Sequence, residues 1–189
     1  MAPRSDEQFE AMRQQTIDKI NGSALKLFSE FGYKNTSVAA IAKEAGISKG
    51  LIYNYYKSKE DVLVGVLEGF QKMEEAFTDL PKFTLEEILT QYYLMLEHQQ
   101  GFLKMMISMS LDVKELPIVQ RFIEKKVEKN MKMFVPLFED LGFEDPKSEA
   151  WFLSTLIEGM LILRIVAKQH YPIELVKNEI NKRYKINIK

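Results

Sequence analysis

The residues best suited to chemistry lie between Gly46 and Lys59, where three lysines and three tyrosines occur with no acid among them. Lysine ammonium groups attract phosphate, tyrosine hydroxyls donate to phosphate oxygens, and Gly50 lets the backbone approach a duplex closely. These residue types indicate contact with the backbone of a nucleic acid. Charge alone leaves a solvated lysine face as an equally good interpretation.

The overall charge of the chain is nearly balanced. The 189 residues carry a net charge of -1, and residues 1–60 hold nine Lys/Arg against seven Asp/Glu. The remainder holds seventeen against twenty. This asymmetry is mild, so any nucleic-acid interface must be a local patch rather than a basic domain.

Composition argues against several classes of protein. The chain has no cysteine and only two histidines, His98 and His170. It also has no Gly-rich phosphate loop and no Glu-x-x-His pair, so we expect no catalytic residues, no metal site and no cofactor. The polar N-terminus MAPRSDEQFEAMRQQ lacks the apolar segment of a signal peptide, and we find no run of eighteen apolar residues. We therefore expect a cytoplasmic protein with no membrane partner.

The hydrophobic pattern predicts an all-α fold, because apolar residues recur at intervals of three and four throughout. Glycine, proline and capping residues divide this pattern into about nine helices. Their expected ranges are about 17–31, 38–45, 48–56, 59–77, 84–98, 101–109, 117–141, 145–169 and 172 onward, and the first helix is expected to have a frayed tail before Thr16. Thr36 or Ser37 is expected to cap the second helix, capping boxes are expected at Ser58/Asp61 and Thr84/Glu87, and Pro136 is expected to kink or break the seventh helix.

The second and third predicted helices, joined by Ala45-Gly46-Ile47-Ser48, have the form of a helix-turn-helix. A helix over Ser48–Tyr55 would be about 12 Å long, which matches the width of a major groove. Its apolar residues would pack on the preceding helix and leave Lys49, Gly50, Tyr53, Asn54 and Tyr55 facing outward. The alternative is a tight helical corner in which the tyrosines are half-buried packing residues.

A longer stretch carries a family resemblance. The string TSVAAIAKEAGISKGLIYNYYKSKEDVL, preceded by ALKLFSEFGYKNTS, resembles the DNA-binding signature of TetR/AcrR-type transcriptional regulators. It covers about residues 17–67, and the remainder agrees with the family in length and helix count. The resemblance implies a three-helix DNA-binding domain over 1–58 and a helical ligand-binding and dimerisation domain over 59–189.

The resemblance also implies roles for individual residues. Thr36 and Ser37 correspond to the phosphate-contacting start of the second helix, and Lys49 and Gly50 to the groove-facing start of the recognition helix. The implied DNA-binding set is Thr36, Ser37, Lys49, Gly50, Tyr53, Asn54, Tyr55 and Lys59. Leu51 and Ile52 carry no hydrogen-bonding group where some relatives have a polar residue, so direct reading of bases is expected to be limited.

The predicted eighth helix is apolar on nearly every face between Ala150 and Ala167. Such a helix needs burial on two sides, and a second copy of the chain would cover one of them. The resemblance implies the same, since TetR-like proteins dimerise through their last two long helices. The expected dimer interface is Trp151, Thr155, Gly159, Ile162 and Val166. A central core helix of a monomer is the alternative.

A small-molecule site is the other expectation for the C-terminal domain. Methionine and aromatic residues between 70 and 138 could line an apolar cavity, although many of them must form ordinary core. The candidate ligand-binding residues are Phe70, Tyr92, Met95, His98, Phe102, Met106, Phe134 and Glu158. For His98 and Glu158, a solvated or salt-bridged side chain is the alternative.

The sequence thus predicts a homodimeric transcriptional repressor that a small, largely hydrophobic effector releases from a double-stranded DNA operator. We expect no enzyme activity. A helical dimer that binds protein partners instead of DNA is the competing interpretation, and activation rather than repression also stays open.

Overall fold

The computed structural model describes residues 6–78, 83–110 and 116–188, with side chains for 7–72, 83–109 and 116–188. The predicted break at 80–83 falls largely outside these ranges. Every regular element in the described ranges is a helix, which confirms the all-α prediction.

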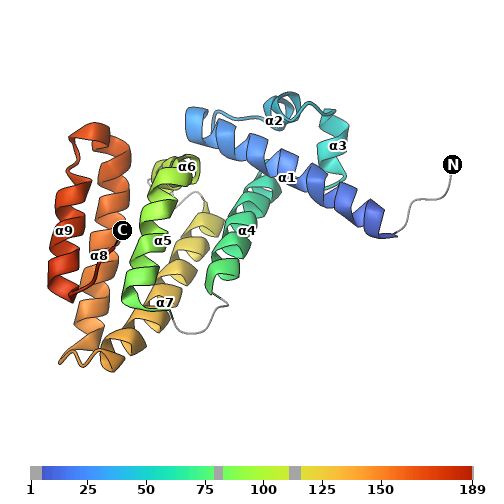
Figure 1. Cartoon of the computed structure of the whole chain (residues 1–189). Coiled ribbons are helices and arrows are strands. Elements are labelled where there is room, and N and C mark those ends of the chain that lie inside the picture. The colour runs from blue at the N-terminus through green and yellow to red at the C-terminus, as the bar shows by residue number, and fades with distance from the viewer. Residues whose placement is uncertain (1–5, 79–82, 111–115, 189) are drawn as a thin grey trace. The chain divides into compact units, whose positions relative to one another are not determined.

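The helices follow the predicted order closely (Figure 1). The α-helices of the described chain are α1 Asp6–Phe31, α2 Val38–Glu44, α3 Lys49–Tyr53, α4 Lys59–Thr78, α5 Leu85–His98, α6 Gln100–Ser110, α7 Pro117–Asp140, α8 Pro146–Ala167 and α9 Ile173–Tyr184. A short 3-10 turn, η2 Lys168–His170, joins α8 to α9. The tail before Thr16, where fraying was expected, is helical from Asp6, and α3 is shorter than the predicted 48–56.

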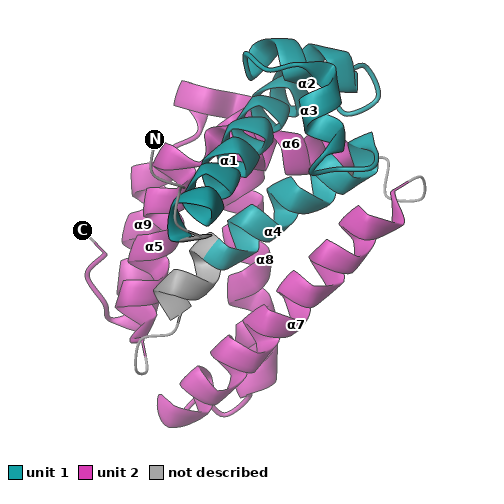
Figure 2. Cartoon of the chain, turned by 90° about the vertical axis from the view of Figure 1, so that its right-hand side faces the viewer, with its two compact units in different colours: residues 1–77 teal, residues 78–189 magenta. Residues whose placement is uncertain are grey.

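The chain divides into two compact units, residues 1–77 and 78–189 (Figure 2). The boundary expected from the family resemblance lay at 58/59, before α4. The difference has a local cause. Tyr56 donates its hydroxyl to Asn21 Oδ1 at 2.7 Å, and Asn21 Nδ2 donates to the carbonyl of Gly65 in α4 at 3.0 Å. These bonds attach the first half of α4 to α1, so α4 belongs with the first unit.

The first unit is held by a small apolar core. Ile20, Ala24 and Phe28 form the inner stripe of α1, and Ile41 and Ile52 bring α2 and α3 onto it, all of them almost fully buried. Two sharp turns connect these helices. Gly32 has φ 80° and Gly46 has φ 65°, a left-handed conformation that glycine adopts without strain.

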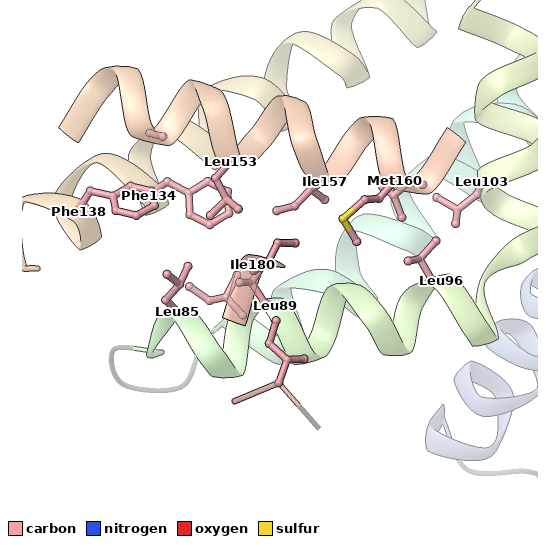
Figure 3. Close-up of a cluster of buried hydrophobic side chains, with 14 residues drawn as sticks. Leu85, Leu89, Leu96, Leu103, Phe134, Phe138, Leu153, Ile157, Met160 and Ile180 are labelled. Atoms are coloured by element: carbon pink, nitrogen blue, oxygen red, sulfur yellow. The ribbon is translucent and has the colours of Figure 1, made fainter. Parts of the chain in front are cut away.

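The second unit is a helical bundle in which α7 and α8 pack closely together. Side chains from α5, α7, α8 and α9 meet in one apolar cluster (Figure 3). Phe134 and Phe138 of α7 face Leu153 of α8, while Ile180 of α9 lies beside Leu89 of α5. This cluster fixes the relative positions of α5, α7 and α8, which carry several of the candidate ligand-binding residues.

Helix ends match the capping chemistry of the sequence in most places. Ser37, rather than Thr36, caps α2 by accepting from the Ala40 amide. Thr84 and Glu87 form the predicted capping box of α5. At the start of α4 the Asp61 amide donates to Ser58 Oγ, but the Asp61 carboxylate accepts from Lys57 rather than from Ser58. The predicted box at Ser58/Asp61 is therefore only half formed.

Pro136 does not end α7, so the break, one of the two effects predicted for it, does not occur. The helix continues to Asp140, and the Leu141 amide donates to the Leu137 carbonyl at 3.0 Å. Pro136 is exposed, so the carbonyl that loses its helical partner can bond to water instead. The cost of the proline is small enough for the helix to continue.

In the described part of the chain, one helical stretch, Pro146–His170, has the length and apolar composition that a membrane span requires. The core helix of a soluble protein meets the same criteria. Leu153, Ile157 and Leu161 of this stretch are buried in the core of the second unit. This packing is that of a core helix with one further apolar face.

Candidate functional site

The outward face of the helix-turn-helix carries most of the residues predicted to contact DNA. Ser37 at the start of α2 is exposed, as are Lys49, Gly50 and Asn54 on and beside α3. Tyr53 is 47% exposed, and the Lys49 Nζ lies over its ring at 5.8 Å from the ring centroid. Lys49, Gly50, Tyr53 and Asn54 form one exposed surface, which we call the α3 face, and Ser37 lies outside it at the start of α2.

The opposite side of α3 explains why this surface is presented. Ile52 is fully buried, and the amides of Tyr55 and Tyr56 both donate to its carbonyl, which continues the turn beyond Tyr53. Tyr55 is half-buried as a result. Ser48 begins the helix by accepting from the Leu51 amide at 3.1 Å. One apolar residue and one cap thus orient the α3 face.

Thr36 differs from its predicted role. Its side chain is 4% exposed, and its hydroxyl lies 2.9 Å from the carbonyl oxygen of Gly32 and 3.3 Å from that of Leu27. The hydroxyl therefore donates inward, to the end of α1. Thr36 stabilises the turn before α2 and does not present its side chain to a phosphate.

Lys59 differs in the same way. Its ammonium donates to the carbonyls of Tyr33 at 2.7 Å, Thr36 at 2.9 Å and Lys34 at 3.3 Å. It also lies 4.3 Å from the centroid of the Tyr33 ring. Burial lowers the pKa of Lys59. This lysine is engaged with the protein itself, whereas the prediction grouped it with the DNA contacts.

The remaining α3 face is suited to electrostatic and hydrogen-bonding contact with an anionic polymer. No acid lies in this stretch to repel phosphate, and no ion pair involving Lys49 is found in the described structure. Leu51 and Ile52 have aliphatic side chains, which carry no group that could hydrogen-bond to a base edge. The surface favours phosphate contact over direct base readout.

A second candidate surface lies on α8. Large apolar side chains are left exposed toward both ends of this helix: Trp151 46%, Phe152 47%, Ile162 45%, Leu163 46% and Val166 67%. Thr155 is also exposed, and a Cβ placed on Gly159 would meet nothing within 4 Å. The five residues predicted for the dimer interface thus share one side of α8, which we call the α8 face.

Polar atoms inside the second unit form a third feature. The Tyr92 hydroxyl of α5 donates to Asn130 Oδ1 of α7 at 3.2 Å, and Asn130 is only 8% exposed. Ser154 of α8 is 7% exposed, and its hydroxyl, like that of Tyr93 on α5, is buried with no hydrogen-bond partner among the described residues. Because a buried hydroxyl without a partner is destabilising, this arrangement suggests a ligand group that would satisfy it.

The structure brings together some of the predicted ligand residues and not others. Phe134 is fully buried, and Tyr92 and Met95 pack against the same core. Phe102 contacts Phe122 edge to face at 6.1 Å between ring centroids, and Met106 is half-buried on α6. These residues remain candidates. Phe70 lies on α4, in the first unit.

His98 and Glu158 fit the alternative interpretation better. His98 is exposed in the last turn of α5. Glu158 accepts from Lys126 Nζ at 2.7 Å, with the lysine side chain 21% exposed. One is solvated and the other is salt-bridged, so neither points an unoccupied polar group into the core.

Asn130 and Ser154 were missed by the sequence analysis. Asn130 precedes Phe134 by four residues and Phe138 by eight, so it lies on the apolar stripe of α7. A polar residue at that spacing was a usable signal. Ser154 lies one residue after Leu153 on a helix that is apolar all round, where the sequence gives no stripe against which to place it.

A charged cluster in the second unit joins α8 to α9. Arg183 donates to Glu149 through Nε at 3.0 Å and Nη2 at 3.1 Å, and the Tyr184 hydroxyl donates to the same carboxylate at 2.6 Å. Arg183 also stacks over Phe152 of the α8 face, at 4.5 Å. Chiefly because Arg183 donates to it, the pKa of Glu149 is lowered. No group of three metal-ligating side chains occurs in the described residues.

Comparison with known proteins gives a consistent result for the first unit. Residues 21–66 match a family model described as "Bacterial regulatory proteins, tetR family". Over 181 residues the chain is 32% identical to an uncharacterized HTH-type transcriptional regulator, YuxN, of Bacillus subtilis, covering 84% of this chain and 60% of YuxN. It is 51% identical over 51 residues to the HTH-type transcriptional regulator HbdR of Aromatoleum, covering 27% and 22%. The chain thus spans 60% or less of the length of these two relatives.

A solved structure extends the similarity to the fold of the whole chain. A transcriptional regulator of Aquifex aeolicus, described as of the TerR/AcrR family, superposes with a TM-score of 0.72 at 24% identity. The match covers 90% of this chain and 98% of that one. At this identity it shows the fold alone.

Proposed function

Because residues 21–66 match the tetR family model and the chain is 32% identical to an HTH-type regulator over 181 residues, we propose that it belongs to the TetR family and is a DNA-binding transcriptional regulator, not an enzyme. The observation that carries this proposal is the α3 face. Lys49, Gly50, Tyr53 and Asn54 are exposed together on a helix whose other side is anchored by Ile52. Ser37 and Tyr55 complete the proposed contact set, with DNA contact confined to residues 1–58.

We further propose that the regulator acts as a homodimer formed through the α8 face. An exposed apolar stripe is energetically unfavourable in water, and a second copy would bury it without requiring any other protein. Two copies would present two α3 faces to two half-sites. The affinity of the dimer for DNA would then exceed the weak affinity of a single protomer. A helical dimer of this kind is soluble, and we place it in the cytoplasm.

The proposed effector is a small, largely hydrophobic molecule bound inside the second unit. Apolar side chains would surround it, while Asn130 and Ser154 would bond its polar end. The effector would release DNA only if it bound more tightly to a dimer conformation that no longer fits the operator. The resulting activity is ligand-relieved repression.

Selection from a pool of randomised duplexes tests DNA binding without knowledge of the operator. We expect the parent protein to enrich a sequence with two similar half-sites, as a two-fold symmetric dimer requires. No enrichment above the starting pool would contradict the proposal. It would favour the competing function, a helical dimer that binds protein partners.

A Ser154→Ala variant tests the effector site. In the free protein, the variant should be more stable by about 1 kcal/mol, because it removes a buried hydroxyl without a partner. Apolar acids, amines and alcohols that release DNA from the parent should be less effective on the variant. Ser108→Ala, at an exposed position on α6, is the control. Equal release from parent and variant by every compound would refute the site.

A further inference from the structure

Lys59 occupies an unusual position for a lysine beside a DNA-binding surface. It is the first residue of α4, yet its side chain reaches back across 23 to 26 residues of sequence to the turn between α1 and α2. There it meets three backbone carbonyls and the face of one aromatic ring. We call Lys59 together with Tyr33, Lys34 and Thr36 the Lys59 clasp.

The clasp uses the full bonding capacity of the ammonium group. A lysine ammonium has three N–H donors and no acceptor, and three carbonyl oxygens lie at 2.7, 2.9 and 3.3 Å from Nζ. A phosphate contact would require at least one of these bonds to break. In this geometry the Lys59 ammonium bonds to the turn between α1 and α2 and has no N–H left for a phosphate.

The other bonds seen for the turn lie within it or connect it to α1. One backbone bond closes it, from the Thr36 amide to the Tyr33 carbonyl at 3.3 Å. Three contacts connect it to α1: the Thr36 hydroxyl, the Asn35 side-chain amide, which donates to the Phe31 carbonyl at 3.0 Å, and the Tyr33 ring, whose centroid lies 5.3 Å from that of Phe28. In the described structure, Lys59 supplies the hydrogen bonds that connect it to α4. The turn leads directly into Ser37, the cap of α2.

Resting on the proposed function, we propose that Lys59 is a positioning residue for DNA binding: its bonds to the carbonyls of Tyr33, Lys34 and Thr36 set the α1–α2 turn, and hence Ser37, relative to the α3 face. It makes no phosphate contact of its own. A lysine of this kind affects DNA affinity through the shape of the free protein rather than through its charge.

Charge-preserving and charge-removing substitutions separate positioning from contact. Arginine can replace lysine against a phosphate, but its planar guanidinium does not fit three carbonyls that converge on one point. We therefore expect Lys59→Arg and Lys59→Met both to weaken binding of a duplex selected by the parent, each by about tenfold or more. Lys59→Arg binding as tightly as the parent would overturn the proposal.

Hydrogen exchange of the Thr36 amide in the protein without DNA provides the second measurement. Both Lys59 variants should speed exchange at Thr36, by about tenfold, because the turn loses its charged hydrogen bonds. Lys49→Met serves as the contact control: it should weaken binding while leaving Thr36 exchange unchanged. Unchanged exchange in both Lys59 variants would refute the clasp.

Failure of the proposed function would look different. If the parent binds no duplex, DNA binding is wrong and the positioning role is wrong with it, although Thr36 exchange would still report the clasp as a structural contact. A different result would refute the positioning role alone. If the parent binds and Lys59→Met lowers the slope of log affinity against log salt by about 0.9 per site, the change expected of Lys49→Met, then Lys59 contacts phosphate and the inference fails.

Discussion

Two glycines in α4, four residues apart, should respond in opposite ways to the same substitution. A Cβ built on Gly65 would overlap the Tyr56 hydroxyl and would lie 2.8 and 2.9 Å from two carbons of its ring. A Cβ on Gly69 would meet nothing within 4 Å, and Gly69 is exposed. We predict that Gly69→Ala stabilises the protein and that Gly65→Ala does not.

The magnitude follows from two effects. Alanine is about 1 kcal/mol more favourable than glycine in a helix interior, and both variants gain this. Gly65→Ala must also displace the Tyr56 ring by several tenths of an ångström. That ring is held by its bond to Asn21, which itself bonds to the Gly65 carbonyl. Overpacking of this kind costs about 1 to 3 kcal/mol, so the two variants should differ by that amount.

Urea unfolding followed by far-ultraviolet circular dichroism measures this difference in the full chain. A third variant, Tyr56→Ala, serves as the background control because it removes the ring. In that background Gly65→Ala should stabilise as much as Gly69→Ala does in the parent. If Gly65→Ala stabilised the parent as much as Gly69→Ala, the packing of Tyr56 on α4 would be refuted.

Three further predictions concern the second unit. Val166→Glu on the α8 face should shift the protein from dimer to monomer in sedimentation velocity, because a carboxylate would be buried in the proposed apolar interface; an unchanged dimer would place the interface elsewhere. Thr84→Ala should lower the free energy of unfolding by about 1 kcal/mol through loss of the α5 cap, and no change in urea would contradict the capping box. Since the folded-state pKa of Glu149 is lowered, its contribution to stability is present above the unfolded pKa and is lost as the pH falls through the folded pKa. Arg183→Met should therefore make the free energy of unfolding fall less steeply with decreasing pH on the acid side. The same steepness in parent and variant would show that the ion pair does not contribute.

The sequence predicted the helices well because their signals are local. Gly32, Gly46 and Gly142 each end a predicted helix and each has a positive φ. Thr84 with Glu87 forms its capping box from residues three apart. Pro136 was interpreted from the same local rules, but its effect depends on whether the released carbonyl reaches solvent. That exposure is set by the packing of α7 and is absent from the local sequence.

The candidate site was predicted less evenly. Lys49 and Tyr53 are exposed as expected, because helical spacing from the buried Ile52 determines which side of α3 faces outward. Thr36 and Lys59 fit the DNA-binding set by position in the family pattern, yet their bonding partners lie up to 26 residues away. Contacts over that distance depend on how α1, α2 and α4 meet. A linear motif cannot distinguish a lysine directed outward from one directed toward a turn.

The central claim, that the α3 face binds DNA, is tested most directly by the salt dependence of duplex binding for the parent, Lys49→Ala and Tyr53→Ala. Lys72→Ala, on α4 about 20 Å along the helix from Lys59, removes an exposed charge away from α3 and serves as control. We predict that both α3 variants bind more weakly than the parent. Lys49→Ala should also lower the slope of log affinity against log salt by about 0.9 per site, while Lys72→Ala leaves both unchanged. Equal affinity and slope in all four proteins, or no binding by the parent at low salt, would contradict the account.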